Sequence, residues 1–185
     1  GALRRVAEGV GWNHAHARLG MCICDQSVID SALDFVIAMP KIAWNDLFEA
    51  ARAARTRAHA VYSRFQVGAA IWCSDGSIVA GCNVENASYG LTLCAERNAI
   101  AAMVLAGKTP MAVAIVADST TPTPPCGACR QVLAEFSDGS LEVRSQTSKG
   151  IEDVWQLKSL LPHAFTRQTL EDAVDLPAND RSLAK

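Results

Sequence analysis

Three cysteines and one glutamate constrain this chain more than any other feature of its sequence. Cys94 and Glu96 are separated by one alanine, and further along the chain Cys126 and Cys129 form a Cys-x-x-Cys pair directly after a proline. Cysteine thiolates are zinc ligands; a structural site uses four protein ligands, whereas a catalytic site uses three and keeps the fourth position for water. The sequence therefore predicts a fold that gathers Cys94, Cys126 and Cys129 around one zinc ion per chain.

The position of Glu96 predicts what such a centre does. Glu96 is too close in sequence to Cys94 to be a comfortable fourth ligand, but it is well placed to move the protons of a bound water. Cys-x-Glu followed by Pro-Cys-x-x-Cys is the signature of zinc deaminases, in which the glutamate is the general acid/base and not a ligand. The expected reaction is attack of hydroxide on an amidine-like ring carbon, with Glu96 carrying protons to the ring nitrogen and the departing amine.

Other readings of the cysteines explain less of the pattern. A redox Cys-x-x-Cys pair accounts for neither Cys94 nor Glu96, and a zinc ribbon needs a second Cys-x-x-Cys or a histidine pair. The zinc-peptidase motif His-Glu-x-x-His is absent from the sequence. A non-catalytic, zinc-stabilised binding module stays open as an alternative of a different class, although it would have no use for Glu96.

Composition excludes several broad classes. The chain has 185 residues, of which 50% are hydrophobic, and a net charge of −2, which fits one domain of ordinary size with tails. A near-neutral, slightly acidic balance argues against a nucleic-acid groove, and the apolar runs are too short to span a membrane. No secretory signal pattern opens the sequence, so we expect a cytoplasmic protein with reduced thiols.

Hydrophobic periodicity predicts alternating helices and strands. The turn Ser74-Asp75-Gly76 joins the first two strands into a hairpin, and Asn45 is the expected N-cap of the first helix. The expected elements are helices over 44–59, 94–105 and 127–136, strands over 67–73, 77–84, 111–117, 141–145 and 151–155, and a helical turn over 157–161. This order predicts an α/β fold: a three-layer α/β/α domain with a mixed, roughly five-stranded sheet.

The sequence predicts a compact domain with a segment outside it at each end of the chain. Residues 1–39 are expected to form an N-terminal extension, the compact domain to cover 40–175, and 176–185 to be a polar C-terminal tail. His14, His16, Cys22 and Cys24 lie in the extension, but their spacings do not match those of known zinc sites.

The charge of the predicted zinc site suggests a role for two neighbouring arginines. Three thiolates leave the centre with an excess negative charge of about one, which would weaken the acidity of the metal. Arg97 and Arg130 each follow a metal-binding cysteine directly. We expect at least one of them, Arg97 first, to donate to the sulfurs and offset this charge.

Asn83 and Glu85 precede the first metal-binding cysteine at the end of a predicted strand. Residues two apart on an extended strand point to the same side. An amide and a carboxylate on one face suit the hydroxyls of a sugar. Considered alone, however, the pair would be interpreted as a polar loop tip that follows a strand. Their closeness to Cys94 favours sugar binding.

From about residue 43 to 172 the sequence resembles the small homotetrameric, zinc-dependent cytidine deaminases. The resemblance depends on five segments: Tyr62-Ser63-x-Phe65-x-Val67-Gly68-Ala69-Ala70, Gly81-x-Asn83-Val84-Glu85-Asn86-Ala87-Ser88-Tyr89, Cys94-Ala95-Glu96-Arg97, Pro125-Cys126-Gly127-Ala128-Cys129-Arg130-Gln131-Val132 and Leu160-Leu161-Pro162-His163-Ala164-Phe165. The first forty or so residues have no counterpart in that pattern, and Asn98 stands where a small or β-branched residue is more usual.

The resemblance implies hydrolysis of cytidine and 2′-deoxycytidine to the uridine nucleosides and ammonia, in pyrimidine salvage. It implies that Asn83 and Glu85 hold the ribose 3′-hydroxyl and that Phe65 and Ala95 line the nucleoside pocket. It further implies a homotetramer with shared active sites, in which Phe165 stacks on the pyrimidine bound by a neighbouring subunit and Tyr89 reaches across the same interface. Spacing alone would have placed Phe165 in the core.

Two alternatives within enzymes stay open. The substrate would be a modified cytosine nucleoside, such as a nucleoside antibiotic, or a cytosine in a nucleic acid. The Asn83-x-Glu85 pair favours an ordinary ribose, and the acidic balance, without a basic and aromatic-rich groove, argues against nucleic acid.

Overall fold

The computed structural model describes residues 41–173; the extension predicted over 1–39 and the tail predicted over 176–185 lie outside these residues. Within the described range the elements follow in the order α2 (Trp44–Arg55), β1 (Val67–Cys73), β2 (Ile78–Cys82), η1 (Tyr89–Leu91), α3 (Ala95–Leu105), β3 (Pro110–Ala117), α4 (Gly127–Glu135), β4 (Glu142–Thr147), β5 (Glu152–Gln156), α5 (Leu157–Leu160) and α6 (Arg167–Ala173).

The described strands form one mixed sheet in the order β2-β1-β3-β4-β5. β1 pairs antiparallel with both β2 and β3, β3 pairs parallel with β4, and β4 pairs antiparallel with β5. The parallel pair requires a crossover, and α4 supplies it. β2 and β3 run in the same direction, so their carboxyl ends lie at the same edge of the sheet. The segment with Cys94 follows β2 and the segment with Cys126 follows β3, and the two segments meet at this edge.

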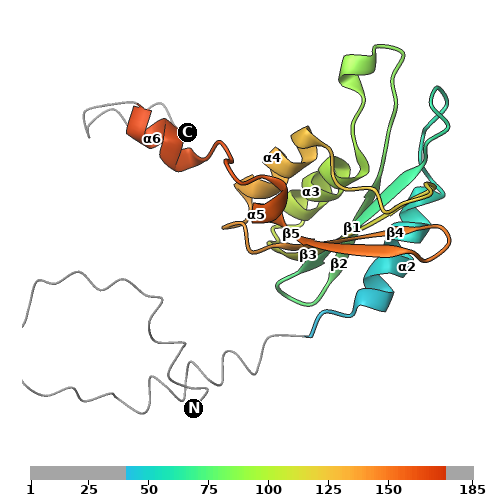
Figure 1. Cartoon of the computed structure of the whole chain (residues 1–185), viewed down its shortest axis with the longest axis horizontal. Coiled ribbons are helices and arrows are strands. Elements are labelled where there is room, and N and C mark those ends of the chain that lie inside the picture. Colours follow the sequence, from blue (N-terminus) through green and yellow to red (C-terminus); the bar gives the residue numbers. More distant parts are fainter. Residues whose placement is uncertain (1–40, 174–185) are drawn as a thin grey trace, which may run out of the picture. The chain divides into compact units, whose positions relative to one another are not determined.

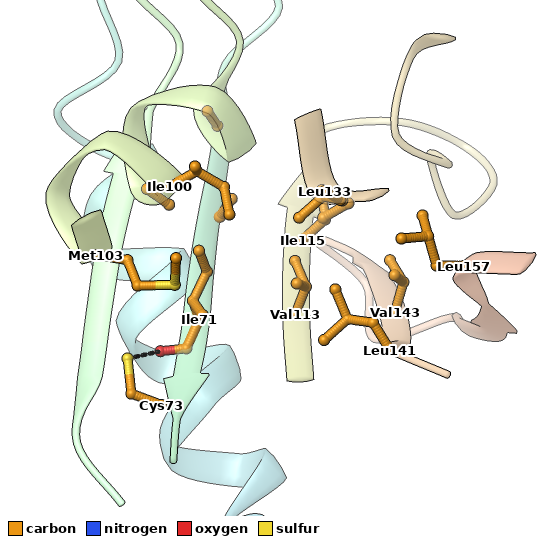
Figure 2. Packing of buried hydrophobic residues seen from close by; sticks show 13 residues of the cluster. Ile71, Cys73, Ile100, Met103, Val113, Ile115, Leu133, Leu141, Val143 and Leu157 are labelled. Carbon is orange, nitrogen blue, oxygen red and sulfur yellow. Dashed lines mark hydrogen bonds between the residues drawn. The ribbon is translucent and has the colours of Figure 1, made fainter. Parts of the chain in front are cut away.

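Helices cover both faces of the sheet, which confirms the predicted three-layer α/β/α domain (Figure 1). α2 packs on one face through Leu47, Phe48 and Ala51, against alanines of β1 and β3 together with Trp72 and Val116. α3 and α4 pack on the other face around the larger apolar cluster. Figure 2 shows Met103 of α3 against β1, and Leu133 of α4 against β3. The core thus holds the amino ends of α3 and α4 over one end of the sheet.

Two glycines allow the helices to approach the sheet closely. A Cβ atom on Gly68 of β1 would lie 1.9 Å from the carbonyl oxygen of Ala51 in α2, and one on Gly81 of β2 would lie 2.4 Å from the amide nitrogen of Ala99 in α3. No side chain fits at such distances, so glycine is required at both positions. Gly81 consequently fixes how closely α3, with Cys94 at its start, sits on β2.

The first helix differs from the sequence prediction at both ends. Ala43, not Asn45, is its N-cap residue, and the helix ends at Arg55 rather than His59. The early end has a structural reason: the amide of His59 donates to the Asn83 carbonyl, and the His59 carbonyl accepts from the Glu85 amide. His59 leaves the helix to extend the pairing at the end of β2, which brings the following loop over Asn83 and Glu85.

Candidate active site

The three predicted metal-binding cysteines meet at the amino ends of two helices. Cys94 and Cys126 are the N-cap residues of α3 and α4, and Cys129 lies in the first turn of α4. The Cys126 Sγ is 3.6 Å from the Cys94 Sγ and 3.4 Å from the Cys129 Sγ, and the three sulfurs lie within 4.8 Å of one another. Sulfurs bound to a tetrahedral zinc at about 2.3 Å are about 3.8 Å apart. The donor set therefore fits zinc.

The protonation of this cluster explains why it needs a cation. The pKa of Cys94 is lowered to about 6, first because the Cys129 thiol hydrogen-bonds to it, with help from Cys126 and from the charge of Arg97. The pKa of Cys129 is raised, because it donates that proton to Cys94 and is itself buried. Helix amino ends stabilise one thiolate, but further anions beside it require a positive charge such as zinc.

Glu96 lies beside the sulfurs in the first turn of α3, and its side chain is 5% exposed. Burial, first, together with the charge of the neighbouring Cys94, raises the pKa of its carboxyl to about 7. A carboxyl group that gains and loses a proton near neutral pH is suited to general acid/base chemistry. The structure thus places a buried carboxyl group, with a pKa near neutrality, next to a donor set that fits zinc.

A cavity of about 240 Å³ opens next to this cluster. Its walls come from the loop before β1, the ends of β1, β2 and β3, the start of α3 and the loop before α4. Its lining residues are Ser63, Phe65, Val67, Asn83, Glu85, Thr92, Cys94, Ala95, Glu96, Ile115, Thr123, Pro124 and Cys126. Of the predicted substrate-binding residues, the cavity brings together Phe65, Asn83, Glu85 and Ala95.

Asn83 and Glu85 are held by backbone groups of the preceding loop. The Asn83 side chain donates to the Phe65 carbonyl at 2.9 Å and accepts from the Val67 amide at 2.8 Å. One amide hydrogen and one lone pair of Asn83 are left for a ligand. Asn83 thus continues the pairing of β1 and β2 through its side chain and keeps the pocket wall in place.

The two predicted charge-compensating arginines sit differently. Arg130 Nε donates to the Pro125 carbonyl at 2.7 Å, and its Nη1 donates to the Leu160 carbonyl at 2.9 Å. Arg130 therefore supports the backbone that presents Cys126. The charge of Arg97 lowers the pKa of Cys94. Compensation of thiolate charge is an expectation for both arginines, and this electrostatic effect favours Arg97.

Tyr89 and Phe165 lie outside the cavity formed by the described residues. Tyr89 is 75% exposed and packs edge-on against Tyr62 at a ring-centroid distance of 6.0 Å. Phe165 is 57% exposed, and its backbone exchanges two hydrogen bonds with the Gln131 side chain. Large aromatic side chains in such positions are typical of interface residues.

Three supporting residues were missed in the sequence. Ser63 hydrogen-bonds to Glu85, Asn98 Nδ2 donates to the Cys82 carbonyl at 2.8 Å, and the buried Ser145 hydroxyl accepts from the Thr123 amide at 3.0 Å. Each joins segments that are distant in sequence, so no local pattern shows the contact. This hydrogen bond accounts for the unusual asparagine at position 98, because it joins α3 to the end of β2.

The part of the chain that forms this site is similar to known proteins. Residues 43–143 match the family model described as the cytidine and deoxycytidylate deaminase zinc-binding region. A cytidine deaminase of Halalkalibacterium halodurans is 46% identical over 127 residues, covering 68% of this chain and 96% of that protein. A cytidine deaminase of Mycobacterium tuberculosis is 43% identical over 128 residues, covering 69% and 92%.

Solved structures give the same result. The crystal structure of cytidine deaminase from Burkholderia pseudomallei is 47% identical, has a TM-score of 0.64, and covers 67% of this chain and 100% of that chain. The family model's range, residues 43–143, contains the three cysteines, Glu96 and the residues that line the cavity. The chain belongs to the cytidine and deoxycytidylate deaminase family.

Proposed function

We propose that this protein hydrolyses cytidine and 2′-deoxycytidine, with water, to uridine or 2′-deoxyuridine and ammonia. The observation that carries this proposal is the buried Glu96, which lies beside a Cys₃ donor set and lines one cavity together with Asn83 and Glu85. A non-catalytic zinc module would gain nothing from a buried, protonatable carboxyl at this position. A hydrolytic deaminase needs one.

The residues divide the chemistry between them. Zinc held by Cys94, Cys126 and Cys129 would supply an activated water. Glu96 would take one proton from that water and deliver it to the pyrimidine N3 while the water oxygen bonds to C4. It would then take the second proton, from the new C4 hydroxyl, and pass it to the amine, which leaves as ammonia when the C4–N bond breaks. Burial that raises the Glu96 pKa to about 7 lets the same group act as base and acid at neutral pH. Arg97 offsets the thiolate charge.

Substrate recognition follows from the cavity. The Glu85 carboxylate accepts from the ribose 3′-hydroxyl, the remaining Asn83 N–H donates to the same group, and Phe65 and Ala95 line the pocket. The volume of about 240 Å³ lies below the roughly 300–1,000 Å³ of complete small-molecule sites. This supports a site that a second chain closes.

We further propose a homotetramer with shared sites. The exposed Phe165 and Tyr89 would reach the cavity of a neighbouring subunit, where Phe165 stacks on the pyrimidine. The deaminase domain would cover residues 40–175, and we expect the protein in the cytoplasm. In the part of the chain that the structure describes, no helix is both long enough and apolar enough to cross a membrane.

The test of the reaction is the loss of cytidine absorbance with purified, zinc-loaded protein. Glu96→Gln keeps the shape of the side chain but removes the proton carrier, so kcat should fall by about 10²–10⁴-fold. Zinc content, measured by elemental analysis, should stay the same because Glu96 is not a ligand. Glu135→Gln on the exposed face of α4 is the matched control and should be fully active.

Two results would overturn the proposal. The first is absence of turnover by wild-type protein whose zinc content has been verified. The second is full activity of Glu96→Gln. Running modified cytosine nucleosides and a cytosine-containing oligonucleotide in the same assay separates the substrate alternatives, and preference for either over cytidine would replace the proposed substrate.

A further inference from the structure

The carboxylate of Glu85 is held more firmly than a cavity-lining glutamate needs to be. Among the described residues, its Oε2 accepts from the Tyr62 amide at 2.8 Å and from the Ser63 amide at 3.2 Å, and its Oε1 accepts from the Ser63 hydroxyl. All three donors come from one short loop. The carboxylate is therefore fixed in position and direction by residues more than twenty positions earlier in the chain.

The loop adopts an unusual backbone to reach Glu85. Arg64 has a φ angle of 60°, a left-handed conformation that costs a residue other than glycine roughly 1–2 kcal/mol. The Arg64 amide donates to the Ala60 carbonyl at 3.0 Å, which closes the turn and directs the Tyr62 and Ser63 amides toward the carboxylate. Strain of this kind persists where surrounding contacts enforce it.

The Ser63 hydroxyl has one direction available for its hydrogen. Its oxygen accepts from the Phe65 amide at 2.9 Å, and an ionised carboxylate can only accept, so the hydroxyl hydrogen is donated to Glu85. This hydrogen bond is the main reason that the pKa of Glu85 lies below its ordinary value. Ser63 thus connects the carboxylate that faces the cavity with the backbone of Phe65, which also lines it.

We propose that Ser63 is a positioning residue that sets Glu85 to recognise one free sugar hydroxyl. A carboxylate has about four acceptor positions; the loop occupies three, and the one that is left, on Oε1, faces the ligand. That position can accept a hydrogen bond from a sugar hydroxyl, but it cannot form one with an ether, a phosphate or a hydrogen atom that replaces the hydroxyl. The inference rests on the proposed function, since it concerns how the same site reads the ribose.

The test compares Ser63→Ala with wild type on two substrates, cytidine and 3′-deoxycytidine. Loss of a hydrogen bond to a charged group should lower kcat/KM for cytidine about 10-fold, mainly through KM. The value for 3′-deoxycytidine, which has no hydroxyl to present to Glu85, should stay within about twofold of wild type. Discrimination between the two substrates should therefore collapse in the variant.

Rescue and control variants separate positioning from a general loss of structure. Ser63→Thr keeps the hydroxyl and should restore discrimination. Ser140→Ala removes a similar serine–carboxylate hydrogen bond, to Asp138 on an exposed turn, and should match wild type on both substrates. If Ser63→Ala does not fold, Ser63→Cys takes its place, since cysteine is a weaker donor of similar size. This variant should also lose kcat/KM for cytidine selectively, but by a smaller factor.

Two outcomes would overturn the inference. One is that Ser63→Ala loses the same factor on both substrates, and the other is that it keeps full efficiency on cytidine. Absence of cytidine turnover by the wild-type protein would instead count against the proposed function itself, so the two failures can be told apart.

Discussion

At the residue scale, Arg130 shows how a side chain next to a metal ligand contributes through the backbone. Its guanidinium joins the Pro125 carbonyl, just before Cys126, to the Leu160 carbonyl of α5. Arg130→Ala leaves both partly buried carbonyls without this donor. Hydrogen bonds from charged groups are worth about 1.5–3 kcal/mol, so we expect the free energy of unfolding to fall by about 2 kcal/mol, measured by urea denaturation.

The control for this variant is Arg167→Ala. Arg167 pairs with Glu171 one helical turn away, but the two side chains are 85% and 51% exposed. Exposed pairs of this kind contribute little, so the loss should stay within about 0.5 kcal/mol. Equal losses in the two variants would show that Arg130 has no structural role beyond its surface charge.

Single residues also mark the limit of what the sequence predicts. Cys94, Glu96, Cys126 and Cys129 are found by spacing, because the chemistry requires those residue types at those intervals. Ser63 is not found, since a serine in a polar loop looks the same whether or not a carboxylate from another segment lies against it. The role expected for Phe165 comes only from the family resemblance, because hydrophobicity alone would place this residue in a core, whereas it is exposed.

At the element scale, the contact between α3 and β2 decides where Cys94 and Glu96 lie. A methyl group on Gly81 would fall 2.4 Å from the Ala99 amide and 2.7 Å from the Ala95 carbonyl, and both atoms belong to the backbone. Gly81→Ala must therefore move α3 away from the sheet. We expect a loss of about 1–3 kcal/mol in unfolding free energy together with lower zinc retention during dialysis.

Gly127→Ala is the comparison variant, because among the described residues a Cβ atom there meets nothing within 4 Å beyond its chain neighbours and the nearby backbone of its own helix. Alanine is also the better helix former at this first position of α4, so stability should be kept or slightly raised. A Gly81→Ala protein as stable as wild type, with normal zinc retention, would mean that α3 is not set by this contact.

The sequence predicts the kind and order of the elements from α2 to α5 apart from η1, but it predicts neither η1 nor α6, and it places some element ends wrongly. The apolar run of β3 and the hairpin of β1 and β2 follow from pattern alone. The first helix ends at Arg55 because His59 exchanges hydrogen bonds with Asn83 and Glu85. The helical pattern of the sequence continues through that point, and only tertiary pairing stops it.

At the scale of the whole molecule, the small cavity and the exposed Phe165 lead to a prediction about assembly. Glu96 belongs to the chain that holds the zinc, whereas Phe165 is exposed and would serve a neighbouring chain. Phe165→Ala should lower kcat/KM by about 10–100-fold, since stacking on a base is worth about 1–3 kcal/mol. Each of the variants Glu96→Gln and Phe165→Ala is thus impaired for a different reason.

Mixing the two variants tests whether sites are shared. After co-expression with two affinity tags and isolation of mixed oligomers, random assortment gives about one site in four an intact Glu96 from one chain and an intact Phe165 from its neighbour. Activity should then exceed the sum of the separate variants. Size-exclusion chromatography with light scattering provides the mass. A fully active monomer, or mixed oligomers no more active than their parts, would contradict shared sites, because complementation requires that no single chain contain a complete one.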